Sequence, residues 1–175
     1  HINYRTPADA VPHLLDKKNV DMLTSHGVFT EAEIRSRYEI TLENYCKTII
    51  IEANTMVDMA KTQIAPAVSA YASELAGTSA AKKALDSALA CGYETELVRK
   101  LSALTDRIYD GAVAVENSLL SLAAAEDIGE EAALIRDQVL AGMGELRVAC
   151  DEAETLTAKR YWPYPSYGDL LFSVQ

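Results

Sequence analysis

Apolar residues recur every three or four positions through most of the chain, the spacing that puts side chains on one face of an α-helix. The longest stripe runs from Ile34 to Leu75, and two more lie within residues 94–127 and 128–159. No segment alternates apolar and polar residues as a half-buried strand does. The pattern predicts an all-α fold on three long helices. The stripes consist of Ile34, Tyr38, Leu42, Tyr45, Ile49, Ala53, Met56, Ala60, Ile64, Val68, Tyr71 and Leu75; Leu97, Leu101, Leu104, Ile108, Ala112, Val115, Leu119 and Leu122; and Ala132, Ile135, Val139, Met143, Leu146, Cys150, Ala153 and Leu156.

Stripes of this width require apolar partners, which predicts that the helices pack on one another. The short connection at residues 128–130 is expected to turn the last two helices antiparallel. We therefore expect an elongated bundle of about three long helices, with a shorter N-terminal helix over one end. The bundle is expected to occupy residues 1–160, and residues 161–175 to form an extended C-terminal tail of the same structural domain.

Specific residue types indicate where the first helices begin. Thr6 before Pro7 is typical of a helix cap and a first helical residue, and Pro12 is expected to delay the regular start of this helix. Thr30 and Glu33 have the spacing of a capping box, in which each residue accepts a backbone hydrogen bond from the other. This spacing predicts that the longest helix starts directly after Thr30.

Glycine and proline predict interruptions further along. Pro66 lacks the amide hydrogen that an α-helix needs and should bend the longest helix. Gly77 is expected to end that helix. Residues 78–90 are then expected to form a short helical connector that Gly92 closes.

The last fifteen residues follow this helical sequence with a stretch that cannot continue it. Pro163 and Pro165 favour an extended backbone, and the only Trp, three of nine Tyr and one of two Phe fall within residues 161–172. An extended ribbon of large rings is expected to dock, either on its own bundle or on another domain or subunit. The candidate docking residues are Tyr161, Trp162, Pro163, Tyr164, Pro165, Tyr167, Gly168, Asp169, Leu170, Leu171 and Phe172.

Asp169 is the one carboxylate of this tail, but neither a partner group nor a pocket for catalysis is visible around it. Gly168 permits a backbone reversal, and Asp169 is expected to cap a short turn at Leu170–Phe172. We expect the tail to pack mainly on its own bundle, with Leu170–Phe172 reaching a neighbouring surface.

Composition narrows the range of partners. The net charge is −10, from 26 acidic and 16 basic residues, and no basic stripe is present, so nucleic acid and membrane surfaces are not expected partners. Three cysteines without a CxxC spacing indicate buried free thiols and a reducing cytoplasm. A start at His1 without Met suggests a segment of a longer chain.

A search for chemistry-bearing motifs gives no catalytic, cofactor-binding or metal-ligating residue. The three histidines are His1, His13 and His26, and none stands three residues after a Glu, as a di-metal site in a helical bundle requires. Glycine-rich phosphate loops and nucleophile elbows are also missing from the sequence.

The run Tyr161–Phe172 resembles the carboxyl terminus of type III glutamine synthetases, a large bacterial class. Four further strings resemble the same family in the same order, and together they extend the likeness over nearly the whole chain. These strings are Arg5–Pro12, His26–Glu33, Ser36–Ile40 and Asp58–Pro66.

The resemblance implies a parent enzyme that joins glutamate and ammonia with ATP and Mg or Mn on a separate catalytic domain. It implies that this segment follows that domain as a structural or assembly region without ligase activity of its own. Its expected partners are the catalytic domain of its own chain and neighbouring subunits of a cytoplasmic homo-oligomeric ring. Two alternatives remain from the residues alone, a free-standing helical adaptor and a metal-dependent enzyme in a bundle.

Overall fold

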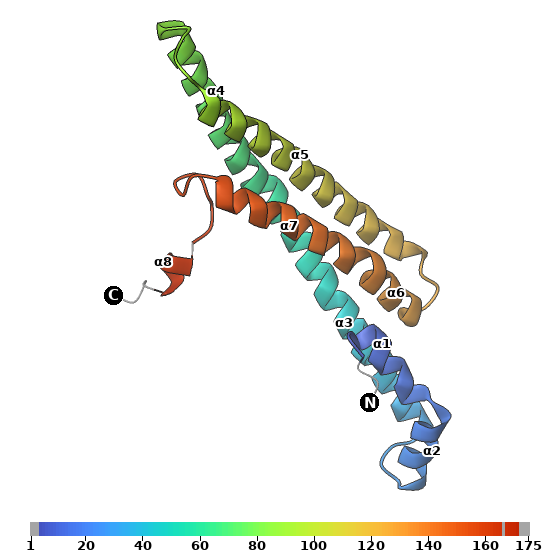
Figure 1. The fold of residues 1–175 in the computed structure, drawn as a ribbon. Coiled ribbons are helices and arrows are strands. Elements are labelled where there is room, and N and C mark those ends of the chain that lie inside the picture. Colours follow the sequence, from blue (N-terminus) through green and yellow to red (C-terminus); the bar gives the residue numbers. More distant parts are fainter. Residues whose placement is uncertain (1–3, 166, 172–175) are drawn as a thin grey trace. The chain divides into compact units, whose positions relative to one another are not determined.

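The computed structural model describes residues 4–165 and 167–171, and every regular element in these ranges is a helix (Figure 1). The predicted all-α bundle is confirmed. The chain forms two compact units, which are considered separately: unit 1 is His1–Thr55 with Val115–Gly142, and unit 2 is Met56–Ala114 with Met143–Gln175. The elements are α1 (Pro7–Ala10), the 3₁₀-helix η1 (Val11–Leu15), α2 (Lys17–Ser25), α3 (Glu31–Met59), the π-turn η2 (Ala60–Ile64), α4 (Ala65–Leu85), α5 (Gly92–Ser121), the 3₁₀-helix η3 (Leu122–Ala124), α6 (Ile128–Leu134), the π-turn η4 (Ile135–Val139), α7 (Leu140–Leu156) and α8 (Tyr167–Leu171).

The N-terminal segment of unit 1 begins as its sequence predicts. The Thr6 hydroxyl accepts a 3.3 Å hydrogen bond from the backbone N–H of Asp9, and Pro7 is the first helical residue. The segment is nevertheless three short helices instead of one helix with a delayed start. Pro12 has no N–H to donate into an α-helical ladder, and the backbone around it tightens into η1.

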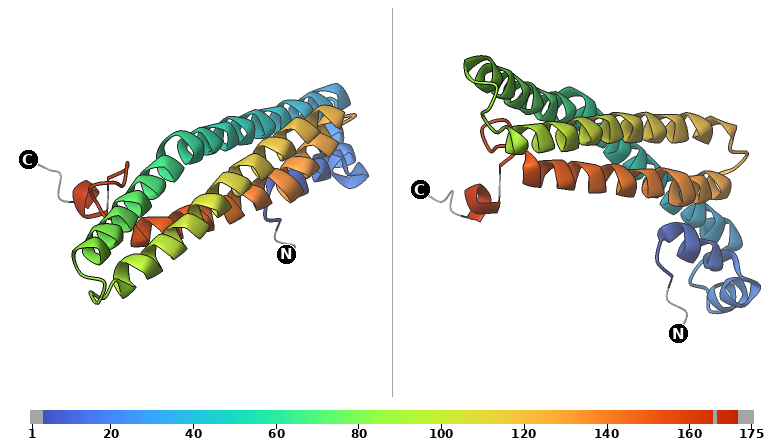
Figure 2. Two further views of the ribbon diagram at one scale, coloured as in Figure 1. Left: turned by 90° about the horizontal axis from the view of Figure 1, so that it is seen from above. Right: turned by 45° about the horizontal axis from the view of Figure 1, so that its top comes forward.

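The start of α3 confirms the predicted capping box. The backbone N–H of Thr30 donates to Glu33 Oε2 at 2.7 Å, and the backbone N–H of Glu33 donates to Thr30 Oγ1 at 3.3 Å. In unit 1, α1, η1 and α2 lie beside this first part of α3 (Figure 2).

The predicted end of the longest helix at Gly77 is wrong, because α4 continues through it to Leu85. The residues after Gly77 are mostly alanine and lysine, strong helix formers that offset a glycine cost of about 1 kcal/mol. Gly92 does not close a connector either; it is the first residue of α5. Before Pro66 the backbone forms η2, in which the N–H of Ala65 bonds the carbonyl of Ala60, five residues back.

The predicted apolar stripes form the cores of both units. Every position in the three stripes is buried or half-buried. In unit 1, Ile34, Leu42 and Ile135 are at most 2% exposed, and in unit 2 Leu101 and Ile108 are fully buried. The 3.6-residue period was therefore enough to identify the buried face of each long helix.

Glycines allow helices to approach closely within each unit. In unit 1, α5 and α6 run antiparallel after a short connection, as predicted (Figure 1), and a Cβ added at Gly142 would lie 3.2 Å from Val115 Cγ2. In unit 2, a Cβ added at Gly111 would lie 3.4 Å from Leu146 Cδ1. Side chains from neighbouring helices therefore rest directly on the backbone at these positions.

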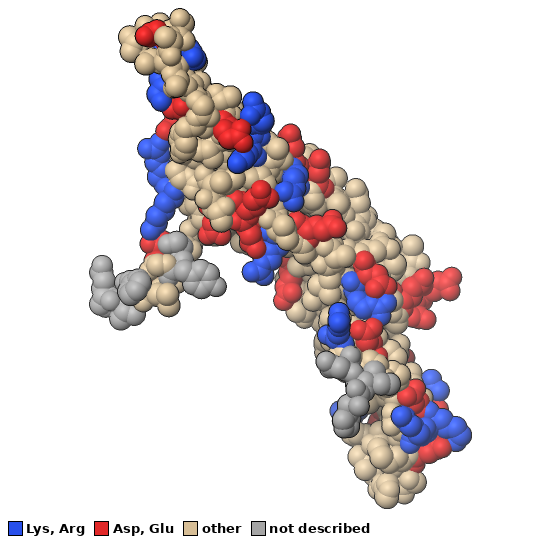
Figure 3. Space-filling model, viewed as in Figure 1, with Lys and Arg blue, Asp and Glu red and all other residues tan. Residues whose placement is uncertain are grey.

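The charged side chains alternate in sign over the surface that Figure 3 shows. Several of them form ion pairs within one helix, such as Glu43 with Lys47 at 2.9 Å. Within the described ranges, the helices lack a stretch that is both long and apolar enough to cross a bilayer.

Candidate docking interface

The tail begins where α7 ends in unit 2. The hydroxyl of Thr157 donates to the Ala153 carbonyl at 2.7 Å, and the chain then makes a turn in which the N–H of Tyr161 donates to the Ala158 carbonyl at 2.8 Å. Residues 162–165 form no regular element, as the two prolines predict. The tail therefore leaves α7 through this turn, and Tyr161 is part of the turn.

A single carboxylate on α4 binds the start of the tail. Arg160 Nη2 donates to Glu74 Oε1, and the hydroxyl of Tyr161 donates to Glu74 Oε2. The guanidinium carbon of Arg160 also lies 5.2 Å from the centroid of the Tyr161 ring. We call Tyr71, Glu74, Arg160 and Tyr161 the tail anchor.

Aromatic contacts add to these polar bonds. The rings of Tyr71 and Tyr161 have centroids 5.4 Å apart, and Tyr71 is only 8% exposed. A hydrogen bond with Tyr93, together with burial, raises the pKa of the Tyr71 hydroxyl. Two helices, α4 and α5, therefore supply rings around the point where the tail leaves the bundle of unit 2.

The pKa directions in the tail anchor agree with its geometry. The Tyr161 hydroxyl and then the Arg160 charge hold the pKa of Glu74 below its ordinary value of 4.5. The same hydrogen bond, by placing a carboxylate against the hydroxyl, raises the pKa of Tyr161. The anchor is consequently formed by an ionised Glu74 and a neutral Tyr161 at neutral pH.

Further along the tail, Trp162 and Tyr164 are half-buried, and their rings meet edge to face with centroids 6.4 Å apart. The hydroxyl oxygen of Tyr164 is buried without a hydrogen-bond partner. Burial raises the pKa of this hydroxyl, and the negative charge of Asp58 raises it further. Tyr164 thus buries its ring at the cost of an unpaired polar atom.

The end of the tail forms α8, and the expected role of Asp169 needs correction. Asp169 lies inside the first turn of α8 instead of capping a turn that follows it, and it pairs with Lys159 at 2.7 Å. The helix starts earlier than expected because Gly168 continues the helical backbone and makes no reversal. Leu170 and Leu171 are 61% and 68% exposed, and Phe172 lies outside the described residues.

The remaining candidates are placed as follows. Pro163 and Pro165 are exposed within the irregular stretch, and Tyr167 is the first residue of α8. Sequence reasoning missed Glu74 and Tyr71, which lie more than 80 residues before the tail. The available signal was Arg160, a cation directly before the aromatic run, which forms an ion pair with Glu74.

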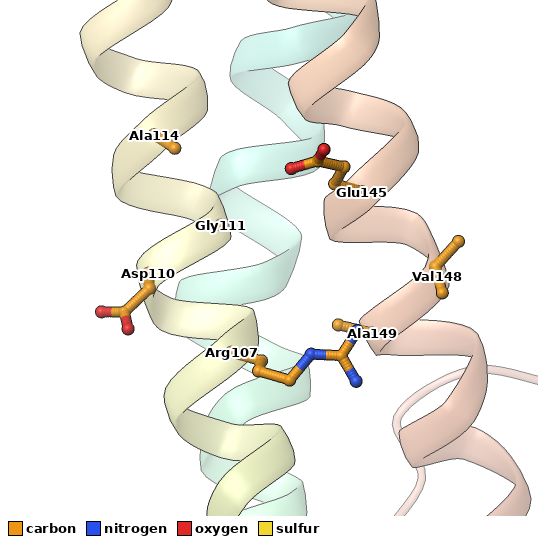
Figure 4. Close-up of a pocket in the computed structure, with 7 residues that line it drawn as sticks. All are labelled: Arg107, Asp110, Gly111, Ala114, Glu145, Val148 and Ala149. Carbon is orange, nitrogen blue, oxygen red and sulfur yellow. The ribbon is translucent and has the colours of Figure 1, made fainter.

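Metal-ligating groups and surface hollows are the other features that could carry chemistry. No group of three or more His, Cys, Asp or Glu side chains able to hold a metal is found within residues 4–165 and 167–171. Unit 2 has a surface hollow of about 470 Å³. Its lining residues belong to α5 and α7 and are labelled in Figure 4. Its Asp110 points away from α7, and its Arg107 pairs with Glu152 at 3.0 Å. Gly111, which has no side chain, and Ala149 are among the residues that line the hollow.

The cysteines match the sequence expectation of buried free thiols. Cys46, Cys91 and Cys150 are all buried and unbridged. Burial raises the pKa of the Cys46 and Cys150 thiols to about 11. Both side chains are therefore protonated and serve as apolar packing groups.

Comparison with known proteins gives a consistent picture. The chain is 34% identical over 173 residues to a glutamine synthetase of Butyrivibrio fibrisolvens, covering 99% of this chain and 25% of that protein. It is 25% identical over 174 residues to the type-3 glutamine synthetase of Dictyostelium discoideum, covering 97% and 24%. A glutamine synthetase of Bacteroides fragilis is 25% identical over 172 residues, covering 94% and 23%.

The chain thus spans about a quarter of the length of these relatives. The sequence model described as the glutamine synthetase C-terminal domain matches residues 2–83, which include α1 to the greater part of α4. Residues 2–83 therefore belong to the glutamine synthetase C-terminal domain family, and the likeness to the named glutamine synthetases runs over nearly all of the chain.

Proposed function

We propose that this chain is the C-terminal structural and assembly domain of a type III glutamine synthetase. The parent enzyme would join ammonia to glutamate with ATP and Mg or Mn in the cytoplasm. The domain would contribute no catalytic residue and would contact the catalytic domain of its own chain and neighbouring subunits of a homo-oligomeric ring.

The observation that carries this proposal is the extent of the likeness. It covers 99% of this chain but only 25% of the Butyrivibrio fibrisolvens glutamine synthetase, and one relative carries the type-3 name. The tail anchor supports a structural role, because it fixes an aromatic segment to the bundle of unit 2 through one carboxylate. A fixed segment loses little further conformational entropy when it docks on a partner.

The test compares three proteins: the full-length product of the gene, the same product lacking residues 4–175, and the 175-residue chain alone. We expect the full-length protein to form glutamine from glutamate, ammonia and ATP. The 175-residue chain should form none, and the deletion should lower the native mass measured by mass photometry. A gene that encodes no ligase before residue 1 would instead favour a free-standing helical adaptor.

A further inference from the structure

An apolar groove lies in unit 1, and none of its lining residues belongs to the tail anchor. It has a volume of about 490 Å³ and is formed by α3 on one side and by the end of α5 with η3 on the other. Four apolar side chains, two amides and one carboxylate line it. We call it the unit 1 groove; its lining residues are Ile50, Asn54, Glu116, Asn117, Leu119, Leu120 and Leu122.

The exposure of side chains at this groove is unusual for unit 1. Leu120 is 74% exposed and Ile51 is 66% exposed, the two highest values among the large apolar side chains described in this unit. Leu120 lines the groove, and Ile51 follows the lining residue Ile50. The most exposed large apolar side chain described in unit 1, Leu120, therefore lines its apolar groove, a combination that marks a contact surface.

We propose that the unit 1 groove receives an apolar segment of the parent chain that precedes residue 1. This inference rests on the proposed function, under which about three quarters of the protein lies before the C-terminal domain. The described chain enters unit 1 at Tyr4, and the Asp9–Arg136 ion pair, with N–O 2.6 Å, fixes α1 to η4 in the same unit. A segment just before residue 1 is thus tethered to the unit that carries the groove, which raises its effective concentration there.

The chemistry of the groove indicates what such a segment must offer. Leu119, Leu120 and Leu122 require apolar side chains, while Asn54 and Asn117 supply polar groups among them. The Asn54 amide nitrogen already donates to the Ile50 carbonyl at 2.8 Å, which holds that side chain in place. An amphipathic segment with apolar anchors on one face meets these requirements.

A second copy of this chain fits the groove less well. In a twofold dimer whose symmetry axis passes through the groove, one groove would face another groove. A concave surface needs a convex occupant, which the preceding part of the chain supplies without this constraint.

The experiment uses the full-length protein with a photo-crosslinking amino acid in place of Leu120. The matched control places it at Leu85, which is 85% exposed at the end of α4 in unit 2. Mass spectrometry of a mixture of isotopically labelled and unlabelled protein separates crosslinks within one chain from crosslinks between chains. We expect position 120 to crosslink within the chain to a peptide before residue 1, at a yield at least roughly tenfold above position 85.

Crosslinks from position 120 to another copy would overturn the proposal, and so would a yield no higher than that of position 85. Glutamine formation by the unmodified full-length protein is measured in parallel. If the protein crosslinks as expected but forms no glutamine, the groove contact stands and the proposed synthetase function is wrong. If it forms glutamine without the crosslink, only the groove proposal is wrong.

Discussion

In unit 1 the N-terminal segment is held by charged side chains, whereas in unit 2 the start of the tail is held by a carboxylate together with aromatic rings. Arg136 bonds Asp9 at 2.6 Å and Asp137 at 2.7 Å, so one cation serves two carboxylates. In unit 2 the Tyr161 hydroxyl donates to a single carboxylate, Glu74, and the Tyr161 ring packs against that of Tyr71. The contrast predicts that the N-terminal attachment depends on one side chain and that the tail attachment is distributed over several rings.

The largest effect is expected from removing residues 161–175. The Trp162 and Tyr164 rings are half-buried, and their burial should stabilise the chain by about 2–4 kcal/mol together. Chemical denaturation of the 175-residue chain, with and without the tail, measures this loss of unfolding free energy. An unchanged unfolding midpoint would mean that the tail contributes nothing to the bundle on its own.

Replacing Arg136 by alanine should loosen the N-terminal segment. The Asp9 carboxylate, whose pKa is lowered by the Thr6 hydroxyl and by Arg136, would lose its charged partner. Hydrogen exchange should show lost protection over residues 7–25 with little change in unit 2. The control is Arg147→Ala, since Arg147 is 75% exposed and pairs with Asp151 at 3.4 Å. Equal behaviour of both variants would contradict a special role for Arg136.

The acid stability of the tail attachment should depend on Glu74. Because its pKa is lowered in the folded protein, its contribution is present above the ordinary value of 4.5 and is lost as the pH falls below it. The Glu74→Gln variant should be less stable than the unchanged protein near neutral pH. As the pH falls below 4.5, the variant should lose less stability than the unchanged protein does. Tyr161→Phe raises the pKa of Glu74 toward 4.5 and should give an intermediate profile. Melting temperatures across this pH range provide the measurement.

The Tyr164→Phe substitution should leave stability unchanged or raise it by about 1 kcal/mol, because it removes a buried hydroxyl that has no partner. Tyr161→Phe is the matched control and should lower stability, since its hydroxyl donates to Glu74. Thermal unfolding of both variants is sufficient. A destabilised Tyr164→Phe protein would show that this hydroxyl has a bound partner such as water.

The smallest effects are expected from two glycines of α7, one in each unit. A Cβ at Gly144 meets nothing within 4 Å, so Gly144→Ala should add about 0.5–1 kcal/mol of stability through helix propensity. At Gly142 a Cβ would lie 3.2 Å from Val115 Cγ2, and Gly142→Ala should gain less or lose stability. Equal gains in denaturation experiments would show that the contact in unit 1 relaxes freely.

Features determined by neighbouring residues could be predicted from the sequence. The reciprocal bonds of Thr30 and Glu33 depend on three-residue spacing alone, and the buried faces follow from the helical period. A single glycine is not a reliable sign of a helix end. The strong helix formers around Gly77 outweigh the free-energy cost of a glycine within the helix. The turn η2 before Pro66 was also missed, since proline predicts a disturbance and not its form.

Features that join distant residues could not be predicted in this way. The bond between Arg136 and Asp9 spans 127 positions, and the bond between Tyr161 and Glu74 spans 87. No periodicity relates such residues, because their proximity depends on how the helices of a unit pack. The sequence therefore predicts that the aromatic tail docks, but it does not show which carboxylate binds the start of the tail.

The position of Trp162 has a practical consequence. It is the only tryptophan in the chain, and it lies in the tail with its ring against that of Tyr164. Tryptophan emission from the unlabelled protein therefore reports on the tail alone. The wavelength of that emission depends on how far the ring is exposed to water. A fluorometer can therefore observe release of the tail without an attached dye.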